Sequence, residues 1–212
     1  MKKPFDVAAL DEFADDFWHA GEKVLQAYQI APFIGMQMEA FLRWANFAPE
    51  ARVIDMGCGF GEFARAAAKI RPSMEVVSLN ISEGQLAYCP EPKLLGDFEF
   101  TGLPDATFDG VVFLFSIGHG DVRKALDEAY RLLRPGGQLL IFDMLGEPDV
   151  LWSLSYDIFD PFQGVASSIG FSLSIMKEFS SYTYTESAFV PPAAMKEHFQ
   201  NARPALWLYT KS

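Results

Sequence analysis

The sequence has few cysteine and histidine residues, which limits the metal chemistry open to it. Its 212 residues include 2 cysteines, Cys58 and Cys89, and 3 histidines. Protein zinc sites are usually built from closely spaced pairs of such residues, and neither cysteine belongs to a pair of that kind. We therefore expect no metal centre.

Basic residues are also scarce. The chain has 17 lysines and arginines against 28 aspartates and glutamates, which gives a net charge of −11. Proteins that bind the phosphate backbone of nucleic acids normally present a basic face. The basic residues here form only short groups such as Lys69 with Arg71. This balance argues against a nucleic-acid partner.

Long apolar segments and a secretory signal are missing too. No apolar run approaches the ~20 residues that a membrane helix needs. The first residues lead directly into an acidic group at Asp11, Glu12, Asp15 and Asp16, which is unlike a signal peptide. We expect a cytoplasmic protein with no membrane span.

Hydrophobic residues are abundant by contrast. They make up 50% of the chain, and phenylalanine alone occupies 20 positions. This composition is typical of a globular enzyme, and the length suits one domain with a sizeable core. Most of the phenylalanines must pack in that core, but some of them can instead line a pocket for an apolar substrate.

Residues 52–64 have the pattern of a strand, a tight turn and a helix. The β-branched residues Val53 and Ile54 suit a buried strand. Three glycines follow at alternate positions from Gly57 to Gly61, and the alanine-rich run 62–69 favours a helix. Glycine lets the backbone turn tightly and lets a ligand approach it without a Cβ in the way. The segment therefore predicts a nucleotide-binding turn.

Together with Asp55, this segment resembles the first motif of class I S-adenosylmethionine-dependent methyltransferases. The spacing is G-x-G-x-G, with an acidic residue two positions before Gly57, whereas dinucleotide oxidoreductases have G-x-G-x-x-G. In the family, the acidic residue helps to hold the methionine end of the cofactor through its amino group. The resemblance therefore implies S-adenosylmethionine as the cofactor.

The residues after the second expected strand, 75–79, extend the resemblance. Most class I methyltransferases have an acidic residue here that binds the ribose, whereas this chain has Asn80, which can accept a hydrogen bond but carries no charge. The run 80–86 resembles the motif of cyclopropane fatty-acid synthases and of sterol and prenyl diphosphate C-methyltransferases. In that subgroup a glutamine helps to bind the ribose, a role that the resemblance gives to Gln85. Ser82 is more simply the N-cap of the following helix.

Two further segments match the family. Asp97 and Phe98 end a short third strand, at the positions where the family has an acid that meets the adenine amino group and a residue that flanks the ring. The fourth expected strand, 107–115, is almost entirely apolar, as in a parallel strand buried on both faces. The residues after it, 116–120, lie where open α/β sheets bind their ligands.

His119 in this loop is our candidate general base, because histidine exchanges protons near neutral pH. The cyclopropane-synthase-like subgroup also has a histidine after this strand. The alternative is that His119 only caps or orients the loop. Asp121 is most simply the N-cap of the helix that follows.

The resemblance implies an α/β fold with a Rossmann-like, seven-stranded class I methyltransferase sheet in the order 3-2-1-4-5-7-6, the last strand antiparallel. The remaining strands are expected at 138–142, 171–184 and 205–209, and the remaining helices at 5–46 (in pieces), 121–133, 148–162 and 191–200. We expect a single methyltransferase domain over 1–212. It comprises a helical cap (1–48), a cofactor-binding core (49–146), and a substrate-side helix with the C-terminal strands (147–212).

The predicted cofactor-binding residues lie at the strand ends: Asp55, Gly57, Cys58, Gly59, Gly61, Asn80, Ile81, Gln85, Asp97, Phe98, Phe115 and Ser116. Four residues outside the matching segments are predicted to contact the substrate: Tyr28, Gln37, Trp152 and Tyr156. The predicted reaction is transfer of a methyl group, by in-line displacement, to a small, at least partly apolar molecule such as a lipid, a terpenoid or another secondary metabolite. The alternatives are a methyltransferase acting on protein or RNA, and a non-catalytic cofactor-binding module.

Overall fold

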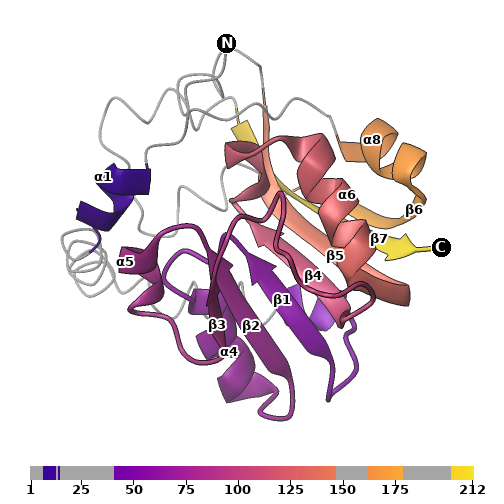
Figure 1. Ribbon diagram of the computed structural model, residues 1–212. Helices are drawn as coiled ribbons and strands as arrows, with labels where there is room; N and C mark the ends of the chain where they lie inside the picture. Colours follow the sequence, from indigo (N-terminus) through magenta and orange to yellow (C-terminus); the bar gives the residue numbers. More distant parts are fainter. Residues whose placement is uncertain (1–6, 13, 15–40, 147–161, 179–201) are drawn as a thin grey trace.

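The computed structural model describes residues 7–12, 14, 41–146, 162–178 and 202–212. Seven strands form one sheet in the order β3-β2-β1-β4-β5-β7-β6 (Figure 1). The strands are β1 (Arg52–Met56), β2 (Glu75–Asn80), β3 (Lys93–Leu95), β4 (Phe108–Leu114), β5 (Leu133–Gly146), β6 (Phe171–Glu178) and β7 (Ala202–Lys211). The helices are α1 (Val7–Glu12), α4 (Glu62–Ile70), α5 (Glu83–Leu86), η1 (Ile117–His119), α6 (Val122–Leu132) and α8 (Phe162–Ile169).

Strands β1 to β5 are parallel, and β7 runs antiparallel to both of its neighbours, β5 and β6. This topology confirms the predicted strand order and the antiparallel last strand. Parallel strands place their carboxyl ends at one edge of the sheet, where such sheets bind ligands. The ends of β1, β2 and β4 carry the glycine turn, Asn80 and Ser116 respectively, so the topology brings these predicted site residues to the same edge.

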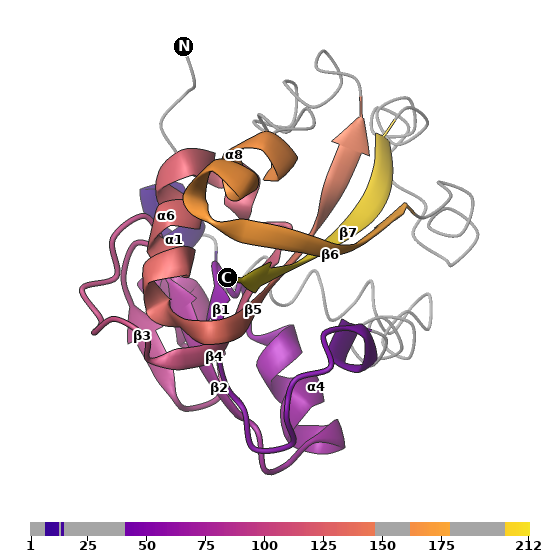
Figure 2. The ribbon, with the colours of Figure 1, turned by 90° about the vertical axis from the view of Figure 1, so that its right-hand side faces the viewer.

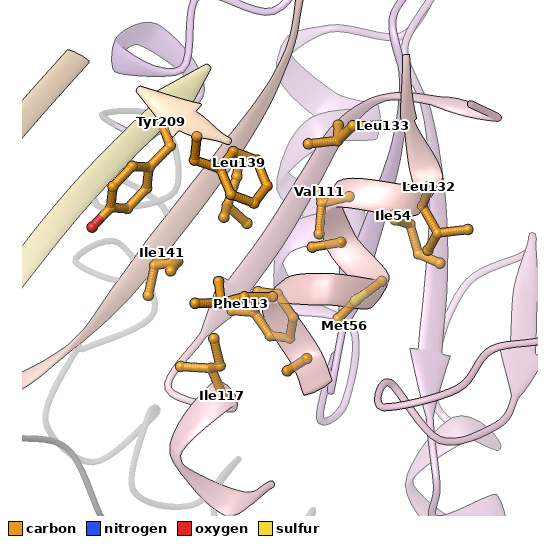
Figure 3. Packing of buried hydrophobic residues seen from close by; sticks show 14 of the residues in the cluster. Ile54, Met56, Val111, Phe113, Ile117, Leu132, Leu133, Leu139, Ile141 and Tyr209 are labelled. Carbon is orange, nitrogen blue, oxygen red and sulfur yellow. The ribbon is translucent and has the colours of Figure 1, made fainter. Parts of the chain in front are cut away.

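Hydrophobic side chains cover both faces of the sheet, because neighbouring residues of a strand point to opposite sides. In β4, Val111 and Phe113 pack with α6 and α8, whereas Val112 packs in a second cluster with α4. Figure 2 shows the same two layers, with α6 and α8 on one side of the sheet and α4 on the other. Figure 3 shows Phe113 beside Ile117, the first residue of η1. The core therefore extends to the edge that carries the candidate site.

The C-terminal half differs from the prediction in two places. Strand β5 begins at Leu133, directly after α6, although the arginine-proline-glycine-glycine run at 134–137 was expected to separate the helix from a strand starting at 138. Leu133 pairs with Phe108 of β4, and the pairing register shifts before Gly110. The strand assignment therefore reaches back over the bend at Gly136, which has a φ of +76°.

Helix α8 was not predicted. Its sequence contains Gly164 and two serines, which are weak helix formers, so local propensity gave no signal for it. Tertiary contacts stabilise this helix instead. Ala166 is fully buried in the cluster that includes α6, and Arg123 of α6 donates a hydrogen bond to Ser168. Most of the helix expected at 148–162 lies outside the described residues.

Other expectations also fall outside the described residues: the helices in the pieces 15–40 and at 191–200, and the continuation of β6 to 184. Within the described residues, no helix is both long enough and apolar enough to span a membrane.

Candidate active site

The glycine turn connects β1 to α4 at the carboxyl edge of the sheet. Gly57, Gly59 and Gly61 have φ angles of +76°, +55° and +81°, a region that residues with a Cβ rarely adopt. The backbone N–H groups of Gly57 and Cys58 both donate to the carbonyl of Leu79 in β2, at 2.9 and 3.0 Å. The turn is therefore fixed to the neighbouring strand before the helix begins.

Two of these glycines have different surroundings. A Cβ on Gly57 would lie 2.6 Å from the Cβ of Ser116, so this glycine allows β1 and the end of β4 to approach closely. A Cβ on Gly59 would meet no described atom within 4 Å. The backbone of the turn is thus open at Gly59, where a ligand can lie directly against it.

Asp55 lies in β1, two residues before the turn, and only 1% of its surface is exposed. Its Oδ1 atom has no hydrogen-bond partner among the described residues. Burial raises the pKa of this carboxyl group well above its ordinary value, and the nearby Glu62 and Cys89 raise it further. A buried carboxylate without a partner is unfavourable, so this site is suited to a group that donates hydrogen bonds or carries positive charge.

Asn80 connects the glycine turn to α5. Its side-chain amide donates to the carbonyl of Gly59 at 3.2 Å and to Oε1 of Gln85 at 2.8 Å, while its Oδ1 accepts from the N–H of Ser82 at 3.3 Å. Ser82 is the N-cap of α5 and accepts from the N–H of Gln85, which confirms the predicted cap. The structure therefore brings Asn80 and Gln85 together beside the glycine turn. Ile81, between Asn80 and Ser82, is 39% exposed.

Asp97 and Phe98 follow β3. Asp97 is exposed and accepts a 2.8 Å hydrogen bond from the N–H of Glu99. The ring of Phe98 packs edge-on against Phe113, with 5.6 Å between the ring centroids. Phe98 also lies within van der Waals distance of the Cβ position of Gly57. The phenylalanine is thus placed under the glycine turn, with the aspartate beside it at the surface.

The end of β4 contributes the other side of the site. Ser116 donates a 2.6 Å hydrogen bond to the carbonyl of Met56, which joins the ends of β4 and β1. Phe115 has a φ of +53°, a strained conformation for a bulky residue, and such strain is concentrated at functional sites. His119 ends η1 and is half-buried, with its N–H bonded to the carbonyl of Ser116 at 3.0 Å. Asp121 caps α6 as predicted.

An aromatic cluster lies beside Phe115. Its ring meets that of Phe142 edge-on at 4.9 Å, and Phe142 contacts Phe41 at 4.4 Å. Phe115 is half-buried, whereas Phe142 and Phe41 are each only 2% exposed. Phe142 pairs with Leu114, so this cluster packs in the core beside the end of β4, and Phe115 is its half-buried member.

Two contributors to the site were not predicted. Asp11 of α1 accepts hydrogen bonds from the Oγ of Ser82 at 2.6 Å and the N–H of Gly84 at 2.9 Å. The sulfur of Cys89 lies 3.6 Å from the sulfur of Cys58, a residue of the glycine turn. The sequence shows an acidic N-terminal group and two cysteines, but no local pattern indicates that either contact forms. No cluster of metal ligands occurs among the described residues.

S-adenosylmethionine fits the chemistry of these residues. Asp55 offers the unpartnered buried oxygen that an amino group requires, and Gly59 leaves the backbone open to close approach. Asn80, Gln85, Asp97 and the Phe98 ring supply polar groups and an aromatic surface around the same edge. Four predicted substrate residues, Tyr28, Gln37, Trp152 and Tyr156, lie outside the described part of the chain.

Comparison with known proteins agrees with this fit. Residues 54–141 match the family model described as "Methyltransferase domain". Over 177 residues the chain is 29% identical to a demethylmenaquinone methyltransferase of Thermus thermophilus, a match that covers 74% of this chain and 79% of that protein. Over 101 residues it is 34% identical to a malonyl-[acyl-carrier protein] O-methyltransferase of Yersinia pestis, covering 45% and 37% of the two chains. The chain spans about half the length of several other curated relatives that it matches.

The fold has solved counterparts as well. A geranyl diphosphate methyltransferase, determined with geranyl diphosphate and sinefungin, matches with a TM-score of 0.75 and 14% identity, covering 84% of this chain and 77% of that one. At this identity the likeness concerns the fold alone. The fold is that of class I methyltransferases, and residues 54–141 match a methyltransferase domain. The comparisons therefore support an S-adenosylmethionine-dependent enzyme, as the first motif predicted.

Proposed function

We propose that this protein transfers the methyl group of S-adenosylmethionine to a small, at least partly apolar molecule. The observation that carries the proposal is the buried, unpartnered Oδ1 of Asp55 two residues before the open glycine turn of a methyltransferase domain. A fold of this kind needs no buried carboxylate for stability, since burying an uncompensated charge is unfavourable. A cationic ligand accounts for its position.

The residues at the carboxyl edge of the sheet each bind a different part of the cofactor. The cofactor supplies a methyl group bonded to a positively charged sulfur. Asp55 holds the amino group of the methionine end. Asn80 and Gln85 bind the ribose, while Asp97 and Phe98 bind and flank the adenine. Fixing the cofactor against a bound acceptor can lower the activation free energy by roughly 7–11 kcal/mol, because the two reactants are held in the reactive orientation.

The acceptor is proposed to lie against Phe115, the half-buried member of the aromatic cluster with Phe41 and Phe142, whose apolar ring helps to exclude water from the reacting groups. The names of the relatives support an organic acceptor group. The relatives are named for demethylmenaquinone and for malonyl-[acyl-carrier protein], and the solved structure contains geranyl diphosphate. Tyr28, Gln37, Trp152 and Tyr156 stay predicted substrate contacts.

His119 is the proposed general base, because η1 places this half-buried side chain shortly after the strained end of β4. In this role it accepts the proton that the acceptor loses. Replacing His119 with alanine should lower kcat by about 100-fold or more, the usual contribution of a general base, and leave cofactor affinity unchanged. Unchanged turnover of an identified substrate would show that His119 only orients the loop.

Cofactor binding is tested by isothermal titration with S-adenosylmethionine and S-adenosylhomocysteine. We expect binding by the unaltered protein and none by Asp55→Ala. Asp127→Asn is the matched control, since Asp127 is an exposed carboxylate on α6 paired with Arg123. Micromolar binding of NADH in place of these nucleosides would overturn the assignment.

The acceptor class is tested with methyl-labelled cofactor and fractionated cell extract. Label in the organic extract, and highest with quinone, lipid or terpenoid fractions, supports the proposal. Label in protein or RNA supports the macromolecular alternative. Tight cofactor binding without incorporation into any fraction supports a non-catalytic module.

We also propose that the protein works in the cytoplasm, without a nucleic-acid partner, as the net charge of −11 indicates. The division into a helical cap (1–48), a cofactor-binding core (49–146) and a substrate-side segment (147–212) is part of the same proposal. Fractionation of cells that express a tagged full chain tests the location.

A further inference from the structure

The two cysteines of the chain lie 31 positions apart, but their sulfur atoms are 3.6 Å from each other. Cys58 belongs to the glycine turn, and Cys89 follows α5. Both are free thiols and both are nearly buried, with 7% and 6% of their surfaces exposed. With Leu86 they form a small cluster separate from the two main parts of the core.

The thiol pair is built into the cofactor turn. Both sulfur atoms lie close to the carbonyl oxygen of Gly59, at 3.7 Å from Cys58 and 3.4 Å from Cys89. The same carbonyl accepts the bond from Asn80. Gly61 also packs tightly here, since a Cβ on it would lie 3.1 Å from the sulfur of Cys89. A change in the distance between the two sulfur atoms should therefore shift the backbone of the glycine turn.

The two thiols also differ chemically. The hydrogen bond from Cys58 lowers the pKa of Cys89, and the nearby Arg65 acts in the same direction. That hydrogen bond raises the pKa of Cys58, as do burial and the charge of Asp55. Cys89 is thus the sulfur that ionises first, and Cys58 is the neighbouring thiol that can resolve an oxidised intermediate.

We propose that Cys58 and Cys89 form an oxidation site for small hydroperoxides, and that the resulting disulfide weakens cofactor binding. The second part rests on the proposed function; the first part does not. Small oxidants suit the site because neither sulfur is exposed enough for a bulky disulfide reagent. Cytosolic disulfides are mostly transient and redox-sensing, which agrees with such a role.

The reaction balances with hydrogen peroxide as the oxidant. The Cys89 thiolate attacks one peroxide oxygen, the O–O bond breaks, and Cys89 becomes a sulfenic acid while hydroxide leaves and takes up a proton. The Cys58 sulfur then attacks the Cys89 sulfur, the S–O bond breaks, and the proton of Cys58 leaves with the hydroxyl group as water. In total, two thiols and one peroxide give one disulfide and two waters.

Disulfide formation requires the sulfurs to approach from 3.6 Å to about 2.05 Å. The turn between Gly57 and Gly61 must move with Cys58, which displaces the open backbone at Gly59 that the cofactor is proposed to touch. Coupling between two sites is reciprocal, so bound cofactor should in turn protect the thiols. Coupled sites typically change affinity by about 5–150-fold, and we expect a loss of about tenfold or more on oxidation.

The test uses the full chain, hydrogen peroxide, and differential alkylation read by mass spectrometry. We expect a Cys58–Cys89 disulfide to form, more slowly in the presence of S-adenosylhomocysteine. Titration of the oxidised protein with S-adenosylhomocysteine should show the reduced affinity, and dithiothreitol should restore it. That recovery separates the disulfide from methionine oxidation, which dithiothreitol does not reverse. Cys58→Ser and Cys89→Ser should each bind the nucleoside with an affinity that peroxide does not change.

Two results would overturn the proposal. One is that both thiols remain alkylatable after peroxide treatment, or that Cys89 stops at the sulfenic or sulfinic acid. The other is a disulfide that forms while the affinity for S-adenosylhomocysteine stays the same. A protein that forms the disulfide but binds neither nucleoside in the reduced state would refute the proposed function and leave the oxidation site established.

Discussion

The Oγ of Ser82 donates a 2.6 Å hydrogen bond to Oδ1 of Asp11, across 71 positions of the chain. The N–H of Gly84 donates to the same oxygen at 2.9 Å. Ala14 packs closely on Gly84 and is 2% exposed. These contacts fix α1 to α5, next to the Asn80–Gln85 pair that we propose binds the ribose.

Replacing Asp11 with alanine should therefore free α1 from α5. We expect faster hydrogen exchange in residues 7–12 and at the amide of Gly84. The bonds from Ser82 and Gly84 hold the pKa of Asp11 below its ordinary value. The contribution of Asp11 is thus complete above the pKa of the unfolded chain, and it is lost as the pH falls through the lower folded value.

Glu12→Ala is the matched control, because Glu12 is the exposed neighbour in the same helix. Its exchange pattern at Gly84 should equal that of the unaltered protein. Equal protection of Gly84 in Asp11→Ala would mean that the hydrogen bond contributes nothing to fixing the segment.

Alanine substitutions at three glycines with positive φ, Gly57, Gly59 and Gly136, should distinguish effects on stability from effects on nucleoside binding. Gly57→Ala should destabilise most, by about 1–3 kcal/mol for overpacking against Ser116 in addition to about 1–2 kcal/mol for the backbone. Gly59→Ala meets no described atom and should lose only the backbone part, about 1–2 kcal/mol, but should weaken nucleoside binding by tenfold or more, about 1.4 kcal/mol.

Gly136→Ala is the control for backbone strain alone. Its φ of +76° equals that of Gly57, a Cβ on it would meet no described atom within 4 Å, and it lies in the bend near the start of β5. Thermal unfolding and nucleoside titration of the three variants check the pattern. If Gly59→Ala bound the nucleoside as well as Gly136→Ala does, the turn would not be the binding surface.

The sequence predicted the parts of the site that have local patterns. Strand, glycines and helix at 52–70 follow from residue type and spacing, and the caps Ser82 and Asp121 are found where predicted. The order of the strands came only from the family resemblance. Long-range pairs such as Asp11 with Ser82, or Cys58 with Cys89, depend on how distant segments pack. No periodicity within either segment records that packing.

The two errors in the predicted fold also arise from contacts between distant segments. Helix α8 forms from weak helix formers because Ala166 is buried against the rest of the core. Strand β5 starts at Leu133 because that residue pairs with Phe108 of β4. In both places tertiary contacts override the local preference, as they commonly do.

Glu128 should stabilise the loop after β3. It is a buried residue of α6, its Oε1 accepts from the N–H and Oγ of Thr101 at 2.8 and 2.6 Å, and it forms an ion pair with Arg131. Burial alone would raise the pKa of Glu128, but the bonds from Arg131 and Thr101 lower it overall. Its contribution is therefore present above the unfolded pKa and is lost as the pH falls through the folded value.

Glu128→Gln should lower the free energy of unfolding by about 2 kcal/mol at pH 7, the scale of a hydrogen bond to a charged group. The difference from the unaltered protein should stay constant from pH 7 down to the ordinary glutamate pKa of about 4.3 and shrink as the pH falls below it. Denaturant unfolding at several pH values measures this. Asp127→Gln, at an exposed position of the same helix, should change stability little. A difference that stays constant well below the ordinary glutamate pKa would exclude the charge as the cause.

Asp55 should behave in the opposite way, because its pKa is raised rather than lowered. Between the unfolded pKa, about 3.9, and the higher folded value, the unfolded chain releases a proton that the folded chain keeps. Stability therefore falls as the pH rises through this range.

Asp55→Asn removes the ionisable group, so we expect it to stabilise the cofactor-free protein at pH 7, by about 1–3 kcal/mol, and to abolish nucleoside binding. Gain of stability with loss of binding is characteristic of a residue retained for its ligand. Denaturant unfolding at pH 4 and pH 7, with and without S-adenosylhomocysteine, gives both quantities. A variant that is less stable than the unaltered cofactor-free protein at pH 7 would show that Asp55 is instead part of the core.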